Sequence, residues 1–286
     1  MNDFYIILTA CLVAINCAIM GSFLVMRKMV MIGDAISHAV LPGIFFAYIF
    51  SGSTSSLPIL IGAASSGILA TIIIEWLTHK AKLQSDASIG ISYTLLFAIG
   101  IILISKFGAN ADIDQQCVLY GELEYVPLWL EPIIGNFYLP KQTIILLIVS
   151  VIVLFAVIWG YKGLFITTFD ENYSLSIGIG VGFWHYFLMS GVSITTVVSF
   201  ESVGAILVIA FLSGPPAIAY LLTGNFRKML VLSCAFGILC SIIGYYLAKS
   251  LDVSVAGSIS VVIGGVFAIV FTATTLRKSK IDVISN

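Results

Sequence analysis

Long apolar stretches, separated by short polar segments, make up most of the chain. Most of them approach the ~20 residues that an α-helix needs to cross the hydrocarbon core of a bilayer. Nine such stretches cover residues 4–26, 34–50, 57–77, 88–106, 139–161, 181–199, 201–222, 229–250 and 253–276. The pattern predicts an all-α polytopic membrane protein with about eight to nine transmembrane helices, organised as a single transmembrane domain over residues 1–286.

Three places interrupt this pattern. We divide the long run from 181 to 222 at its polar interruption, Ser199-Phe200-Glu201-Ser202. The second stretch is short and contains Pro42 followed by Gly43, which predicts a bent or partly unwound helix. Pro215 and Pro216 are expected to break the hydrogen bonding of the seventh stretch, because neither has a backbone N–H.

Alternation of the nine spans sorts the basic residues unequally between the two sides of the membrane. If the N-terminus lies outside, the inner side receives ten of the 13 lysines and arginines, namely Arg27, Lys28, Lys80, Lys82, Lys162, Arg227, Lys228, Arg277, Lys278 and Lys280. The outer side then receives Lys106, Lys141 and Lys249. Because cytoplasmic loops carry an excess of Lys and Arg, we expect the N-terminus outside and the C-terminus in the cytoplasm.

The composition supports the membrane assignment and excludes several functions. Residues are 60% hydrophobic and only 9% charged, whereas soluble domains carry about 25% charged residues. The net charge of −1 gives no basis for binding nucleic acid. The chain lacks a GxxxxGK[ST] loop, so we do not expect it to hydrolyse ATP itself, and it lacks the HExxH and GxSxG motifs of two common hydrolase classes.

An acidic loop, residues 107–138, is expected on the outer side. It carries the carboxylates of Asp112, Asp114, Glu122, Glu124 and Glu131. These could attract cations or form a docking surface for a partner, although acidic outer loops are also common without such a role. The half-apolar part of the loop, residues 117–130, could lie on the membrane or re-enter it.

The longest inner segment, residues 161–178, carries the signals of a short cytoplasmic helix. Thr168 is the expected N-cap, with Glu171 three positions later as in a capping box. The carboxylates of Asp170 and Glu171 suit the positive end of a helix, and Gly178 suits its C-terminal stop.

Asp34 and His38 are the strongest candidates for chemistry. An ionisable side chain inside a membrane segment costs roughly 2.5–3.5 kcal/mol on insertion scales and therefore suggests a function. Four residues apart, the two lie on one face of a helix, where a carboxylate oxygen and an imidazole nitrogen form half of a divalent-cation site. A helix-start aspartate and a histidine bonded to a neighbouring helix would have the same spacing. Zinc prefers about four ligands and manganese about six, so a metal site requires either a two-fold homodimer or further ligands.

Few other residues could supply such ligands. Asn16 in the first stretch and Glu75 near the inner end of the third are polar residues that could line a pore. Their simpler roles are an interhelical hydrogen bond and an interfacial carboxylate beside Lys80. We interpret His79, His185 and Glu201 as a loop residue, a packing residue and a surface residue.

The run Gly33-Asp34-Ala35-Ile36-Ser37-His38-Ala39-Val40-Leu41-Pro42-Gly43 resembles the signature of the membrane permeases of ATP-binding-cassette importers for manganese, zinc and iron. Weaker matches follow along nearly the whole chain, at Ser85–Ile91, Leu119–Gly121, Phe169–Gly178, Ser202–Leu207 and Pro216–Leu222. The double proline at 215–216 and the acidic Gly121-Glu122-Leu123-Glu124 stretch depart from the family pattern.

The resemblance implies a type II importer-like permease that forms a homodimer in the lipid of the bacterial cytoplasmic (inner) membrane. It implies two cytoplasmic ATP-binding-cassette ATPase subunits and an extracytoplasmic metal-binding protein as partners. Asp34 and His38 would then line the translocation path and contact the transported Mn2+ or Zn2+, with no permanently bound cofactor. The segment of residues 163–180, with Asp170, Glu171, Ser174 and Gly178, would couple the permease to the ATPase.

We therefore expect the permease subunit of an ATP-driven importer of divalent transition-metal ions, and not an enzyme. The two ligand types accept manganese and zinc alike, so the preference for manganese over zinc or iron rests on the resemblance. A standalone secondary transporter or cation channel is the alternative. Copurification of an ATPase and a requirement for ATP would distinguish the two.

Overall fold

The computed structural model describes residues 2–51, 56–107, 123–124, 126–128, 130–134 and 137–285. Within these ranges, nine helices are long and apolar enough to cross a membrane. They are α1 (Asn2–Met26), α2 (Met31–Ser51), α3 (Ser56–His79), α4 (Ser85–Phe107), α6 (Lys141–Phe169), α8 (Val181–Val203), α9 (Ala205–Leu222), α10 (Phe226–Leu251) and α11 (Val255–Ser285). The predicted all-α membrane architecture is confirmed.

Short elements connect some of these helices. The helix α7 (Glu171–Ser176) lies between α6 and α8, in the segment where the sequence predicts a short helix. The 3-10 helix η1 (Val126–Leu128) and an antiparallel pair, β1 (Leu130–Ile134) and β2 (Phe137–Pro140), precede α6 and were not anticipated. Asp112, Asp114, Glu122 and most of the segment 117–130 lie outside the described residues, so membrane re-entry there stays a prediction.

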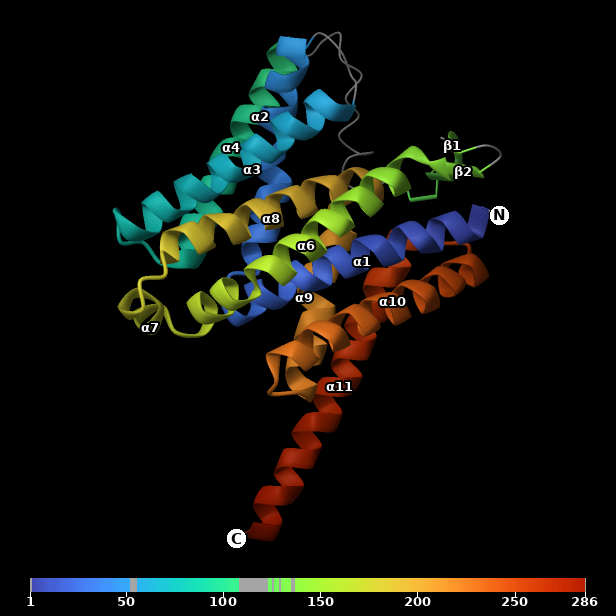
Figure 1. The fold of residues 1–286 in the computed structure, drawn as a ribbon. Helices are drawn as coiled ribbons and strands as arrows, with labels where there is room; N and C mark the ends of the chain where they lie inside the picture. The colour runs from blue at the N-terminus through green and yellow to red at the C-terminus, as the bar shows by residue number, and fades with distance from the viewer. Residues whose placement is uncertain are drawn as a thin grey trace.

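The helix α1 lies at the centre of the molecule, where it contacts α6, α8, α9 and α10. In Figure 1, α1, α6, α8 and α10 run side by side, and α2, α3 and α4 form a second bundle at their edge. The helix α8 contacts both α6 and α3, so it joins the two bundles. The helix α11 packs on α9 and α10 and then projects away from the molecule toward the C-terminus.

Glycines allow close approach between helix backbones, as is usual where membrane helices pack through small residues. At Gly21 of α1, an added Cβ would lie 2.0 Å from the carbonyl oxygen of Leu212 in α9. At Gly43 of α2, it would lie 2.2 Å from the carbonyl oxygen of Gly62 in α3. The side chain of Leu212 also lies against Gly33 of α2. One leucine of α9 therefore packs on both α1 and α2.

Neither proline-containing helix is interrupted. The helix α2 continues through Pro42, and α9 continues through Pro215 and Pro216. The predicted unwinding of the second stretch is therefore wrong, and in the seventh stretch the two prolines interrupt the hydrogen bonding without ending the helix. Each proline removes one backbone hydrogen bond, but the rest of the helix persists because unsatisfied backbone groups are costly in lipid. In α2, the hydroxyl of Ser66 from α3 donates to the carbonyl of Ala39, just before the proline.

Two helix boundaries also differ from the prediction. The helices α8 and α9 are separated by Gly204, and the polar run from Ser199 to Ser202 is helical. Gly204 has φ +80°, a conformation that favours glycine and ends α8. The helix α6 ends at Phe169 and not near 161, because its last turns are packed: Gly163 lies against the Trp184 ring of α8.

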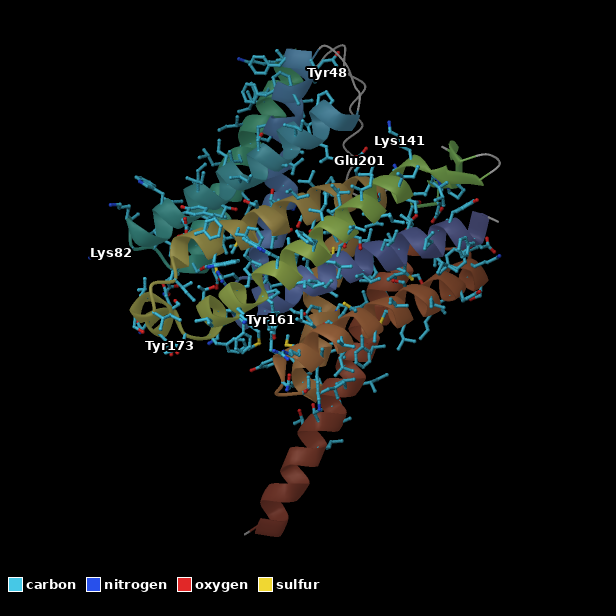
Figure 2. The ribbon with its side chains drawn as sticks, in the orientation of Figure 1. Tyr48, Lys82, Lys141, Tyr161, Tyr173 and Glu201 are labelled. Atoms are coloured by element: carbon cyan, nitrogen blue, oxygen red, sulfur yellow. The ribbon has the colours of Figure 1, made fainter. Side chains whose placement is uncertain are left out.

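One end of the main bundle holds α7 together with the α1–α2, α3–α4 and α9–α10 turns, and we call it the α7 end. Figure 2 shows Lys82 and Tyr173 there, with Lys141 and Glu201 toward the opposite end. The basic residues Arg27, Lys28, Lys80, Lys82, Arg227 and Lys228 lie in or beside the three turns. The charge asymmetry inferred from the sequence therefore corresponds to a physical end of the molecule.

Candidate functional site

Asp34 and His38 lie one turn apart on α2, as their spacing predicts. His38 Nε2 is 3.4 Å from Asp34 Oδ1. Because α2 begins at Met31, Asp34 lies in its first turn, where the helix dipole stabilises a carboxylate. The side chains are 28% and 25% exposed, respectively, for His38 and Asp34. Both groups can therefore be reached from outside the protein interior.

Aromatic rings of α4 border the imidazole of His38. Its ring centroid lies 5.7 Å from that of Tyr93 and 5.4 Å from that of Phe97. The Phe97 ring meets the imidazole edge-on, at an interplanar angle of 82°. These rings limit the orientations open to His38. The sequence analysis missed both, because only the packing of α4 on α2 brings them to the site.

The described residues supply no third metal-ligating side chain to this pair. No group of three or more His, Cys, Asp or Glu side chains suited to a metal ion occurs among them. One oxygen and one nitrogen suit a divalent cation, but they fall short of the four ligands that zinc prefers. Water molecules or a second copy of the chain would have to complete the coordination.

Asn16 of α1, one of the two candidate pore residues, is completely buried. Neither its amide oxygen nor its amide nitrogen has a hydrogen-bond partner among the described residues, so the predicted interhelical hydrogen bond is not found there. Glu201 is exposed near the end of α8, as expected of a surface residue. The side chain of His79 lies outside the described residues.

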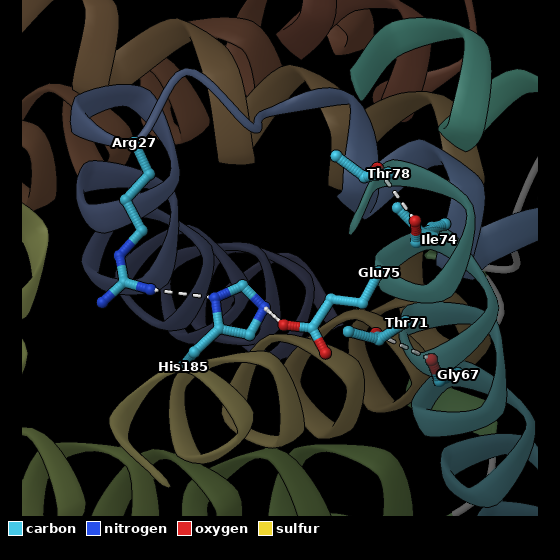
Figure 3. Close-up of polar contacts among 7 residues, drawn as sticks. All are labelled: Arg27, Gly67, Thr71, Ile74, Glu75, Thr78 and His185. Atoms are coloured by element: carbon cyan, nitrogen blue, oxygen red, sulfur yellow. Dashed lines mark hydrogen bonds and ion pairs between the residues drawn. The ribbon is translucent and has the colours of Figure 1, made fainter. Parts of the chain in front are cut away.

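Glu75 and His185 form a second polar cluster with Arg27, and Figure 3 shows the three side chains in a row. His185 Nε2 of α8 lies 3.1 Å from Glu75 Oε1 of α3. On its other side, His185 Nδ1 lies 3.2 Å from Nη1 of Arg27, which directly follows α1. The guanidinium also donates to the hydroxyls of Thr168 and Thr167 at the end of α6, each at 3.1 Å. We call these five residues the Arg27 cluster.

Hydrogen-bond chemistry assigns the protonation of His185. An arginine side chain has only donors, so Nδ1 of His185 must be the acceptor and the ring proton must be on Nε2. The ring is therefore neutral, and its Nε2 faces Glu75 Oε1 at 3.1 Å. Burial lowers the pKa of the Arg27 guanidinium, while the negative charge of Glu171 raises it. The guanidinium stays charged at neutral pH, because an arginine side chain is not deprotonated in proteins.

The sequence analysis gave the members of the Arg27 cluster separate and simpler roles. Glu75 was interpreted as an interfacial carboxylate beside Lys80, and His185 as a packing residue. Arg27 served only as a marker of topology. The pairing of Glu75 with His185 could have been predicted from the rule that ionisable groups in membrane helices have partners.

The helix α7 holds the residues expected to couple to an ATPase. Asp170 is its N-cap, and Asp170 Oδ1 accepts from the backbone N–H of Tyr173 at 2.8 Å. Ser174 is completely buried, and its hydroxyl donates to the carbonyl of Glu171. Gly178 has φ +78°, and the N–H of Ile179 bonds to the Ser174 carbonyl at 2.9 Å. Gly178 therefore ends the helix, as predicted.

The predicted N-cap of α7 is wrong. Thr168 lies within α6, and its hydroxyl donates to the Leu164 carbonyl of that helix at 2.6 Å. The cap is Asp170 because α6 continues to Phe169, which shifts the start of the next helix by two residues. Position 168 instead receives a hydrogen bond from Arg27.

Large apolar side chains of α7 and its flanks face outward. Phe169, Tyr173, Leu175 and Ile177 are about half exposed. A soluble partner could cover such a patch, because contiguous exposed apolar surface usually marks an interaction site.

Comparisons with known proteins agree with this architecture. The model of the ABC 3 transport family matches residues 4–274. The chain is 42% identical to the manganese transport system membrane protein MntD of Bacillus subtilis, over 93% of this chain and 90% of the relative. It is 38% identical to the zinc transport system membrane protein TroD of Treponema pallidum, over 93% and 72% of the two chains.

A solved structure has the same fold. The chain is similar to PsaBC from Streptococcus pneumoniae in complex with Fab, with a TM-score of 0.77 and 33% identity over 93% of this chain and 90% of that one. An inward-facing metal-chelate type ABC transporter, 16% identical with a TM-score of 0.62, shares the fold. The chain belongs to the ABC 3 transport family, as a membrane permease subunit of an ATP-binding-cassette importer.

Proposed function

We propose that this chain is the permease of an ATP-driven manganese importer in which Asp34 and His38 contact the cation. The observation that carries the proposal is the carboxylate–imidazole pair on one face of α2, its side chains partly exposed and 3.4 Å apart. A divalent cation replaces the contact between the two groups by bonds to both. The pair accepts either manganese or zinc.

The relatives favour manganese without excluding zinc. MntD of Bacillus subtilis, at 42% identity, and MntC of Listeria monocytogenes, at 35%, bear manganese names, whereas TroD bears a zinc name at 38%. Manganese accepts oxygen ligands readily, and water can add them at a partly exposed site. We therefore place manganese ahead of zinc and iron as the physiological cargo.

A homodimer with a two-fold axis would complete the site. Two copies would supply two carboxylates and two imidazoles, which makes four protein ligands where one chain supplies two. The α7 end would face the cytoplasm, because basic residues gather in its turns. The exposed apolar patch of α7 would then contact the ATPase, and an extracytoplasmic protein would deliver the cation at the opposite end.

Uptake of radioactive manganese into cells tests the proposal. Asp34→Ala and His38→Ala are each expected to reduce uptake to the level of cells without the permease, while the complex with the ATPase still copurifies. Ser37→Ala is the matched control, because Ser37 lies beside the pair and its hydroxyl bonds to the Gly33 carbonyl of its own helix.

Competition by zinc and iron measures the preference for manganese. Excess unlabelled manganese should suppress uptake at lower concentration than either competitor. Normal uptake by both alanine variants would refute the site, and ATP-independent uptake without a copurifying ATPase would favour a secondary transporter or channel instead.

A further inference from the structure

The Arg27 cluster lies where three parts of the permease meet. Arg27 follows the last residue of α1 and precedes α2, the helix of Asp34 and His38. Thr167 and Thr168 form the last turn of α6, directly before α7. His185 lies in the second turn of α8, shortly after α7. The cluster therefore binds both flanks of α7 to the turn that starts α2.

The guanidinium of Arg27 joins these parts through three different nitrogens. Nε and Nη2 donate to Thr168 and Thr167, and Nη1 donates to His185. Each threonine hydroxyl in turn donates to a carbonyl of its own helix. A planar fork with fixed donor directions can make these bonds together, whereas the ammonium of a lysine acts as a point charge.

His185 carries the connection onward to α3. Its neutral ring accepts from Arg27 at Nδ1, and its Nε2 lies 3.1 Å from Glu75 Oε1. Glu75 also bonds to the hydroxyl of Tyr186 in α8. The helix α3 packs closely on α2, where Gly62 meets Gly43. The flanks of α7 are thus connected to α2 by two routes, through the turn before α2 and through α3.

We propose that the row Arg27–His185–Glu75 is a positioning device that transmits movement of α7 to the helix bearing Asp34 and His38, so that ATP hydrolysis and cation release stay coupled. None of the three residues needs to contact the cation for this role. The inference rests on the proposed function, since it takes α7 as the contact with the ATPase.

Conservative substitutions separate the individual bonds of the row. Arg27→Lys keeps the positive charge but loses the fork. His185→Asn keeps an acceptor near the position of Nδ1 but cannot reach Glu75, and His185→Gln keeps a donor near the position of Nε2 but loses the acceptor for Arg27. Glu75→Gln keeps the shape and an acceptor, and removes the charge.

The measurement is the number of manganese ions moved per ATP hydrolysed, by the complex with the ATPase in proteoliposomes. We expect Arg27→Lys and both His185 variants to assemble and hydrolyse ATP, but to move about tenfold fewer ions per ATP. Glu75→Gln should have a smaller effect in the same direction. Manganese should still protect the variants against thermal unfolding as it does the unaltered protein, because Asp34 and His38 are unchanged.

Thr78→Val is the matched control. Thr78 lies one turn after Glu75 on α3, and its hydroxyl bonds to the Ile74 carbonyl of the same helix. Valine has the same branched shape, so this variant should transport as the unaltered protein does. Arg27→Lys and His185→Asn each interrupt the row Arg27–His185–Glu75. The double variant should therefore move as many ions per ATP as the more impaired of the two single variants.

Unchanged ions per ATP in Arg27→Lys and in both His185 variants would overturn the proposal. Multiplicative losses in the double variant, or equal loss of ATP hydrolysis and transport, would indicate a purely structural cluster and would also overturn it. If a histidine variant fails to assemble, the number of ions that Glu75→Gln moves per ATP decides whether the proposal holds. Failure of the proposed function is distinct, because the unaltered complex would then show no ATP-driven manganese uptake at all.

Discussion

Asp34 and His38 hold each other in place before any cation binds. Their 3.4 Å contact keeps the carboxylate and the imidazole on the same side of α2, and the rings of Tyr93 and Phe97 restrict the imidazole further. In the proposed cation site, this preorganisation would lower the cost of ordering the two ligands.

In the proposed cation site, the imidazole of His38 would set the sensitivity of manganese uptake to zinc. His38→Asp replaces imidazole, which suits zinc, by an oxygen ligand that suits manganese. We expect the zinc concentration that halves manganese uptake to rise by about tenfold, equivalent to about 1.4 kcal/mol. Competition curves on cells with the variant measure this shift, with Ser37→Ala as the control. Persistent manganese uptake with unchanged zinc inhibition would contradict the assignment of His38 as a ligand.

The sequence predicts the Asp34–His38 pair because both residues belong to one helix and four positions separate them. It does not predict their neighbours. Tyr93 and Phe97 belong to another helix, and His185 lies 158 positions after Arg27. Contacts of this kind depend on how the helices pack, which a periodic apolar pattern does not encode.

At the scale of helices, the contact between α1 and α9 depends on Gly21. Pro216 has no N–H to donate to the Leu212 carbonyl four residues earlier, and this carbonyl lies directly on Gly21. A side chain at position 21 would push the two helices apart.

We expect Gly21→Ala to lower the stability of the permease by about 1–3 kcal/mol, the usual range for overpacking a close contact. Thermal unfolding in detergent measures the effect. Gly264→Ala in α11 is the control, because an added Cβ there meets nothing within 4 Å. An equal unfolding temperature for the two variants would show that α1 and α9 can separate without loss.

The apolar stretches predict the nine spanning helices because the bilayer imposes a minimum length on each. The helix boundaries that were predicted wrongly depend on local backbone conformation. Gly204 divides α8 from α9 through a positive φ, whereas the more polar Ser199–Ser202 run remains helical and largely buried. Gly204, which can adopt the positive φ of this turn, therefore marks its position better than the polar residues do.

For the whole molecule, the arrangement of basic turns predicts an α7 end in the cytoplasm. The test uses Cys117→Ser as background, since the other cysteines lie in helices α1 and α10. Gln84→Cys, in the α3–α4 turn, should react with a membrane-impermeant maleimide only after cells are permeabilised. Ser250→Cys, near the far end of α10, should react in intact cells. The reverse labelling pattern would invert the orientation.

The 29-residue length of α6 determines how far α7 stands from the lipid. At 1.5 Å per residue the helix is about 44 Å long, roughly 14 Å more than the hydrocarbon core. A modest tilt still leaves its last turns among or beyond the lipid headgroups. The apolar side chains of α7 would thus stand at or beyond the level of the headgroups, where a water-soluble subunit can contact them.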